Sequence, residues 1–99
     1  MDFKVIFKDT FVMDLERVVR SIAIHNPKAA QALGESLVST AENLNFFPER
    51  HPQVRGRPGN RRFIVKKHFK VFYRVRYGSM SVEILRCWDG RREFGPEIE

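Results

Sequence analysis

Apolar and polar residues alternate at the start of the chain and then recur at helical spacing. Residues 3–8 alternate with a period of two, which predicts a β-strand. Over residues 11–22 the apolar side chains fall on one stripe of an amphipathic helix. Asp9 and Thr10 are residue types that cap a helix N-terminus, and Pro27 marks the end, because the residue before a proline avoids the helical region. The chain is therefore predicted to begin with a strand and a helix.

A second helix is expected directly after the first. Pro27 suits its first turn and Asn26 its N-cap, and apolar residues continue at helical spacing over residues 30–44. The segment Phe-Phe-Pro at 46–48 should close this helix with an apolar lid. Two helices joined by so short a turn predict an antiparallel hairpin.

The second half of the chain predicts a loop followed by three strands. Residues 48–60 contain several prolines and glycines, which are turn formers. The strands are expected at about 61–66, 69–77 and 80–88, with a turn at 78–79. Because the links between them are short, these strands should form an antiparallel meander.

One face of this sheet must pack on the helix hairpin, since each element has a single apolar side. The row expected to be buried consists of Phe69, Val71, Tyr73, Val75 and Tyr77. The opposite row of the same strand consists of Lys70, Phe72, Arg74 and Arg76. Residues two apart on a strand share a face, so the cations should form an outward column. The predicted fold class is α+β, as a single domain over residues 1–99.

Positive charge is concentrated in the second half. The net charge is +6, but residues 1–49 hold 5 Lys/Arg against 7 Asp/Glu, whereas residues 50–99 hold 13 against 5. Between Arg50 and Val82 there is no acidic residue. This asymmetry favours an anionic partner, either nucleic acid, an acidic protein, or both in turn. The alternative interpretation is a solvated basic surface.

Composition also restricts the class of protein. The single cysteine, Cys87, excludes an internal disulfide framework and favours a reducing, cytoplasmic compartment. No secretory signal is expected at the N-terminus, and no apolar stretch approaches the roughly 20 residues that cross a bilayer. No Cys/His spacing suggests zinc, and no glycine loop suggests a nucleotide site. We therefore expect no cofactor, metal or small-molecule ligand.

Three segments resemble the RelE/ParE toxin superfamily. N-P-K-A-A at 26–30 is similar to the family's NP-x-AA turn. R-F-I-V followed by F-K-V-F-Y-R-V, within 62–75, is similar to its arginine strand and its Y-x-I/V-x-Y-R-V strand. I-L-R-C-W-D-G-R-R at 84–92 resembles its closing strand, with Asp89 where a histidine often stands. No segment is specific alone, but their order and spacing match over about 3–93.

This resemblance implies the toxin of a type II toxin–antitoxin module, neutralised by an acidic antitoxin. RelE-like members cut mRNA in the ribosomal A site, whereas ParE-like members inhibit DNA gyrase. By resemblance, Arg62, Lys70 and Arg91 would stabilise charge in a nuclease. His68 is the remaining candidate for proton transfer, although a single loop histidine is more often solvated. The tail lacks the family's tyrosine or histidine, and Phe94 cannot move a proton.

The sequence therefore favours a ParE-like gyrase inhibitor. A ribosome-dependent mRNA endonuclease is the first alternative, and a non-toxic nucleic-acid-binding domain, with Phe72 and Phe94 stacking on bases, is the second. Glu83 is a further candidate base, but it is expected to form an ion pair with the opposing cations. The residues expected to contact nucleic acid or a partner are Lys66, Lys67, Lys70, Phe72, Arg74, Arg76, Arg86 and Arg92.

Overall fold

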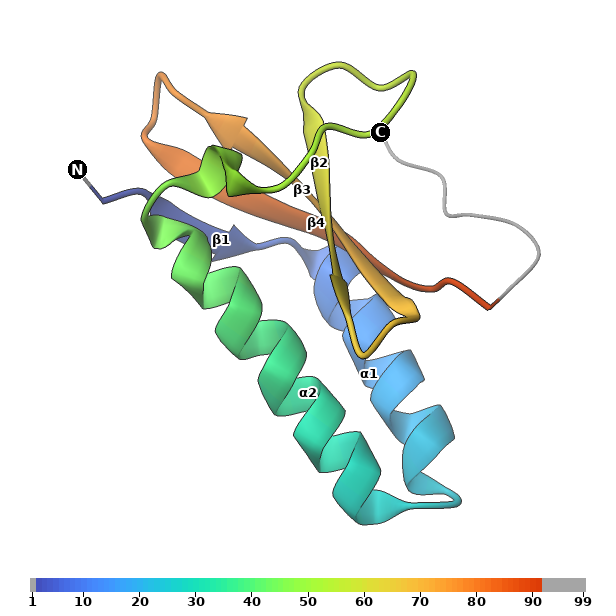
Figure 1. The fold of residues 1–99 in the computed structure, drawn as a ribbon. Coiled ribbons are helices and arrows are strands. Elements are labelled where there is room, and N and C mark those ends of the chain that lie inside the picture. The colour runs from blue at the N-terminus through green and yellow to red at the C-terminus, as the bar shows by residue number, and fades with distance from the viewer. Residues whose placement is uncertain (1, 92–99) are drawn as a thin grey trace.

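The computed structural model describes residues 2–91, and two long antiparallel helices cover one face of a mixed sheet (Figure 1). The elements are β1 (Lys4–Phe7), α1 (Asp9–Ala23), α2 (Pro27–Glu42), 3-10 helices at Asn43–Asn45 and Pro48–Arg50, β2 (Asn60–Val65), β3 (Phe69–Arg76) and β4 (Ser81–Asp89). This order confirms the predicted α+β fold class. The predictions made for Arg92 and Phe94 lie outside the described residues. No helix of the described part is long and apolar enough to span a bilayer.

The sheet has the strand order β1-β4-β3-β2. Strands β2, β3 and β4 form the predicted antiparallel meander. Strand β1 pairs parallel to β4, with Lys4 opposite Ser81 and Phe7 opposite Ile84, a pairing that the sequence did not assign. Because β1 is short, it covers only the first half of β4, and the backbone of the second half needs other partners on that side.

Helix α1 supplies one of those partners. The hydroxyl of Thr10 donates to the carbonyl oxygen of Leu85 at 2.7 Å. The backbone amide of Lys8 donates to the carbonyl oxygen of Ile84 at 3.0 Å. The prediction that Asp9 and Thr10 cap this helix was wrong, because Lys8 holds the N-cap position without a side-chain bond and the hydroxyl is used by β4. The second cap is confirmed: the side chain of Asn26 accepts from the amide of residue 29 at 3.1 Å.

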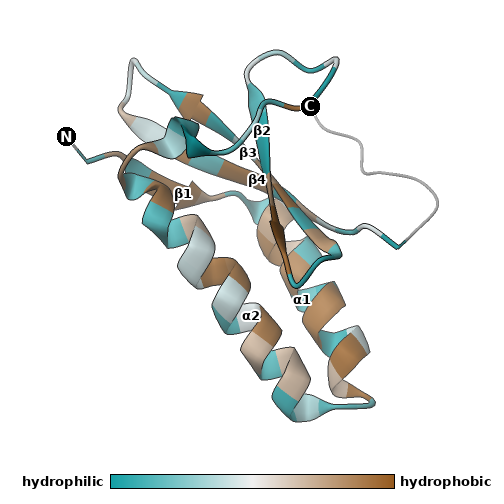
Figure 2. Ribbon diagram, viewed as in Figure 1, coloured by the Kyte–Doolittle hydropathy of each residue, from teal (hydrophilic) through white to brown (hydrophobic). Residues whose placement is uncertain are grey.

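The core lies between the helices and the inner face of the sheet, where apolar positions of both layers meet (Figure 2). Leu37 of α2 and Val71 of β3 are fully buried. Tyr73 is also buried, and its hydroxyl donates to the carbonyl oxygen of Pro48 at 2.6 Å. Tyr77, predicted in the same buried row, is 58% exposed because it lies beyond the end of β3 and donates to Glu49 at 2.8 Å.

The segment after α2 turns outward instead of forming a lid. Phe46 and Phe47 are 62% and 58% exposed. Pro48, the third residue of the predicted lid, is buried. Phe47 has left-handed backbone angles, and this turn is held by the Arg50 guanidinium, which donates to the carbonyl oxygens of Asn43, Phe46 and Phe47. The predicted apolar lid was therefore wrong, because the turn directs both phenylalanine rings to solvent.

Candidate functional site

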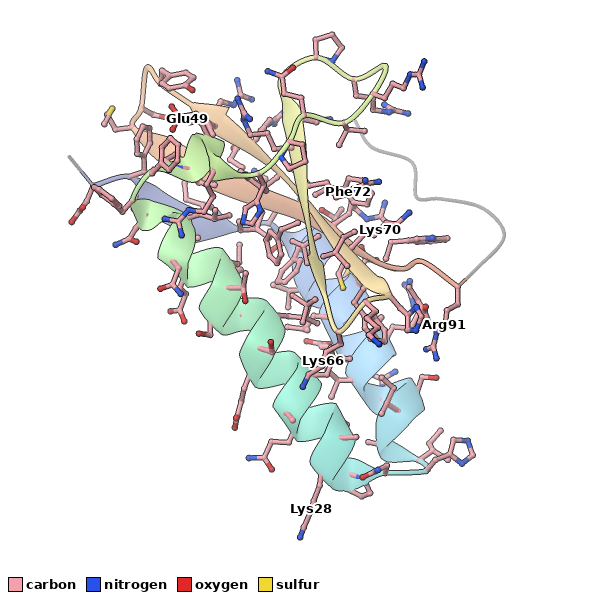
Figure 3. The ribbon with its side chains drawn as sticks, viewed as in Figure 1. Lys28, Glu49, Lys66, Lys70, Phe72 and Arg91 are labelled. Atoms are coloured by element: carbon pink, nitrogen blue, oxygen red, sulfur yellow. The ribbon has the colours of Figure 1, made fainter. Side chains whose placement is uncertain are left out.

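The polar row of β3 faces away from the helices, as predicted. Strand β3 buries its alternate residues, Phe69, Val71 and Tyr73, against the helices. The other row therefore lies on the opposite side, which we call the outer face. Its members on β3 are Lys70, Phe72, Arg74 and Arg76. Lys70 and Phe72 lie beside each other on this strand in Figure 3.

An apolar cluster divides this row. Between Phe72 and Tyr73 the pairing with β4 shifts by one residue, so Leu85 is extra and packs outward on Phe72. The cluster consists of Phe72, Leu85, Val54 and Trp88. Phe72 is only 5% exposed, so the prediction that it stacks on a nucleic-acid base is wrong. The loop residue Val54 covers the cluster, and its fold-back was not predicted.

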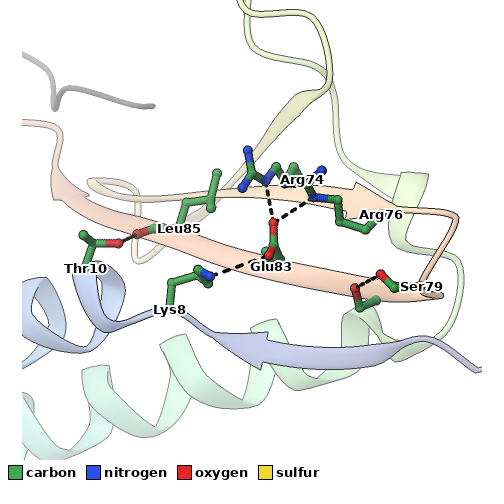
Figure 4. Close-up of polar contacts among 8 residues, drawn as sticks. Lys8, Thr10, Arg74, Arg76, Ser79, Glu83 and Leu85 are labelled. Atoms are coloured by element: carbon green, nitrogen blue, oxygen red, sulfur yellow. Dashed lines mark hydrogen bonds and ion pairs between the residues drawn. The ribbon is translucent and has the colours of Figure 1, made fainter.

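One end of the outer face is partly neutralised. Glu83 accepts from Arg74 at 2.5 Å and from Arg76 at 3.1 Å, and Lys8 lies 3.7 Å from it (Figure 4). The ion pair predicted for this glutamate is confirmed. The hydrogen bond from Arg74 is the main reason why the pKa of Glu83 is lowered. At this end, three cations share one carboxylate.

The other end of the outer face, which we call the open end, carries cations without a carboxylate. Its cations are Arg62 and Lys70, with Lys67 at the tip, and none of them forms an ion pair within residues 2–91. Lys66 instead borders a hollow on the helix side, together with Leu33 and Phe69. Arg62 lies opposite Phe72 and Ile64 lies opposite Lys70, so the two strands place these side chains on one face. Lys66 and Lys67 form the tip of the β2–β3 hairpin, both with positive φ.

Arg91 does not join this cation group. Its guanidinium binds both oxygens of Asp89, at 2.9 and 2.7 Å, and lies 5.5 Å from the ring centroid of Phe69. Phe69 belongs to the helix-facing row and is the register partner of Asp89. Arg62 and Lys70 thus share the outer face, whereas the Arg91 guanidinium is held by Asp89 and the ring of Phe69.

Arg86 also has a partner inside the fold. Its guanidinium binds the carboxylate of Asp14 at 2.6 and 3.1 Å, and the amide of Cys87 donates to the same carboxylate at 3.1 Å. Asp14 is 3% exposed, so this is a buried link between α1 and the free edge of β4. The link was not predicted, since the partners are 72 positions apart.

His68 lies at the hairpin tip, and its side chain is exposed. Its carbonyl oxygen accepts from the amide of Gly90 at 2.6 Å, which joins the tip to the end of β4. Within residues 2–91, the other acid–base candidate on the outer face is Glu83, which is engaged by cations at the opposite end. The described geometry therefore does not bring an acid–base pair to Lys70.

Gly90 is needed for the contact between the tip and β4, a role that its place in a predicted turn did not indicate. A Cβ there would lie 2.7 Å from the carbonyl oxygen of His68 and 3.2 Å from Cε of Lys70. We expect Gly90→Ala to lower the free energy of unfolding by about 1–3 kcal/mol, because the hairpin must move away. Urea unfolding measures this. Gly78→Ala is the control, since its Cβ would meet nothing within 4 Å; equal losses in both variants would contradict the expectation.

Comparisons with known proteins agree with this architecture. The chain matches the family model described as ParE toxin of type II toxin–antitoxin system, parDE, over residues 5–94. A chain of the chromosomal ParDE system from P. aeruginosa superposes with a TM-score of 0.74 at 17% identity, covering 88% of this chain and 95% of that chain. A chain of the RelBE2 toxin–antitoxin complex from Mycobacterium tuberculosis gives 0.64 at 22% identity, covering 90% and 99%.

A free-state arginine mutant of the E. coli toxin RelE gives a TM-score of 0.66 at 12% identity, covering 90% of this chain and 84% of that chain. At such identities the structural likeness shows the fold alone. No curated protein sequence matches the chain. The family model, however, spans most of the sequence. The chain therefore belongs to the family of ParE toxins of type II toxin–antitoxin systems.

Proposed function

We propose that this chain is the growth-inhibiting toxin of a toxin–antitoxin pair, and that it acts on DNA gyrase by binding it. The carrying observation is that Asp89 already neutralises Arg91, one of the three cations that a nuclease would use. Arg62 and Lys70 lie on the outer face, whereas Arg91 is bound to Asp89 over the ring of Phe69. An outer face that binds a partner is the interpretation that this pairing supports.

The chemistry of RNA cleavage also favours a binding inhibitor. Such cleavage needs a base for the 2′-hydroxyl, cations for the charge on phosphorus, and an acid for the leaving 5′ oxygen. Arg62 and Lys70 fit the second requirement only. His68 would have to serve alone as base and acid from an exposed loop. These features support inhibition without RNA cleavage.

We further propose that an acidic antitoxin neutralises the chain. The structural relatives include toxin–antitoxin complexes, namely the ParDE system of P. aeruginosa and RelBE2 of M. tuberculosis. The strongly basic second half is complementary to an acidic partner, and such complementarity speeds association and selects partners. A short acidic reading frame beside the gene would support this pairing.

The test is to induce the protein in growing bacteria and to follow DNA replication and translation separately. We expect DNA replication to fail before translation, with mRNA left intact. Supercoiling by purified gyrase should be inhibited as well. Arg62→Ala and Lys70→Ala should weaken inhibition at least severalfold, because each removes a cation of the outer face. Lys28→Ala is the matched control, since Lys28 lies on α2 at the far end of the helix hairpin (Figure 3).

Two other outcomes would reject the gyrase proposal. Codon-phased mRNA cuts that vanish in Arg62→Ala and Lys70→Ala would identify a ribosome-dependent endonuclease. Continued growth with neither process affected would identify a non-toxic binding domain.

A further inference from the structure

Trp88 lies beside Lys70 on the outer face. The two residues are register partners of β4 and β3, and directly opposite residues have Cβ atoms about 5 Å apart. Trp88 is partly exposed and packs on the cluster formed by Phe72 and Leu85. Its side chain therefore packs on an apolar cluster and keeps part of its surface exposed. Trp88 is the single tryptophan of the chain.

The cations around this ring lack competing carboxylates. Arg62, Lys67 and Lys70 form no ion pair within residues 2–91. Asp89 follows Trp88 in sequence, but it binds Arg91 and is the partner of the helix-facing Phe69. An anionic ligand at the open end would consequently meet an aromatic surface and several available cations.

The hairpin tip carries its charge in an unfavourable backbone conformation. Lys66 and Lys67 have φ of 54° and 70°, where glycine or asparagine is the usual choice. Side chains other than these adopt such angles at a cost, and strained residues concentrate at functional sites. Two lysines in these positions indicate that positive charge at the tip has a use.

We propose that the open end binds single-stranded nucleic acid, with a base stacked on Trp88 and phosphates at Lys70, Arg62 and Lys67. Stacking requires a base that is not already stacked in a duplex, which favours a single strand. An acidic protein would satisfy the cations but has no need of an aromatic platform beside them. The inference rests on the proposed function in one respect: the same face would meet the DNA held by gyrase.

The experiment titrates the full-length protein with a thymidine oligomer of about ten nucleotides, a length within the usual site sizes. Binding should quench the fluorescence of Trp88 and weaken steeply with salt. Trp88→Leu should lower affinity about tenfold or more, as lost base stacking does, and Trp88→Phe should restore most of it. Binding of Trp88→Leu is followed by anisotropy of a labelled oligomer.

Lysine variants test the phosphate contacts. Lys70→Gln and Lys67→Gln should each weaken binding severalfold and reduce the salt slope by about 0.7, the value for one phosphate on a single strand. Lys28→Gln should change neither quantity, because it lies at the far end of α2. Thermal unfolding of each variant confirms that it is folded. A uridine oligomer in parallel tells whether DNA or RNA binds more tightly.

Two results would overturn the proposal. One is equal binding of a polyglutamate peptide that is insensitive to Trp88→Leu, which would mark an acidic-protein surface. The other is no oligomer binding at low salt. Failure of this inference is separable from failure of the proposed function: gyrase inhibition without oligomer binding rejects only the inference, whereas oligomer binding without gyrase inhibition rejects only the proposed function.

Discussion

Replacing Asp14 with alanine is expected to lower the free energy of unfolding by about 3–5 kcal/mol, as breaking a buried ion pair does. Asp14 is 3% exposed and is the acceptor for the Arg86 guanidinium and the Cys87 amide. Without it, a partly buried cation and the amide of Cys87 lose their partner at the point where α1 meets β4. Urea unfolding at neutral pH measures the loss.

Three matched variants isolate this effect. Asp14→Asn should cost less than Asp14→Ala, because its amide oxygen can still accept from Cys87. Arg17→Ala should cost under about 1 kcal/mol, since Arg17 is exposed and lies 3.5 Å from the carboxylate. Combining Asp14→Ala with Arg86→Ala should cost less than the sum of the single changes, as expected for coupled residues. Additive losses, or a loss as small as that of Arg17→Ala, would contradict the assigned role.

Local patterns predicted the elements because each is encoded within a few residues. The period-two alternation of residues 69–76 indicated the outer face correctly, and the Asn26 cap was recognisable by residue type. The parallel pairing of β1 with β4 was not predictable in this way. It joins residues far apart in the chain, and several partners were open to β1.

The site departs from its prediction where distant segments meet. Phe72 lies on the outer face, as the alternation along its strand predicts. The extra residue Leu85 and the loop that folds back at Val54 nevertheless bury it. Arg74 and Arg76 are outward, yet Glu83 neutralises part of their charge. Register shifts and loop folding of this kind leave no periodic signal.

Two residues of the site, Trp88 and Gly90, were missed for related reasons. Because Cys87 was expected in the core, alternation along β4 would have placed its neighbour Trp88 on the outer face, opposite Lys70. The glycine in the turn after β4 was a visible signal, but its steric role depends on the hairpin tip that lies against it. Residue type thus indicates which chemistry is available, and tertiary packing decides which of it is exposed.

Alkaline conditions are expected to destabilise this protein well before its arginines titrate. Burial raises the pKa of Tyr73 from 10.0 to about 12, and burial together with Asp14 and Asp89 raises the pKa of Cys87 from 9.0 to about 12. Each group is neutral when protonated, and the folded state holds its proton more tightly than the unfolded chain does. Their contribution is thus complete below pH 9 and is lost as the pH rises toward 12.

The expected loss is up to about 1.4 kcal/mol per pH unit for each group, beginning near pH 9 for the thiol and near pH 10 for the phenol. Urea unfolding in steps from neutral pH to pH 11.5 measures both slopes. Cys87→Ala should remove the earlier onset. Tyr73→Phe should remove the later one, while costing about 1–3 kcal/mol at neutral pH, because the carbonyl of Pro48 loses its donor.

The two slopes also report on the packing that presents the outer face. Tyr73 and Cys87 face the core from β3 and β4, directly behind the surface that carries Lys70 and Trp88. If both side chains titrate at their ordinary pKa, the unfolding curves of the wild type and the two variants will run parallel with pH. That result would mean that water reaches the inner face of these strands, and the fixed spacing of the outer-face cations would lose its support.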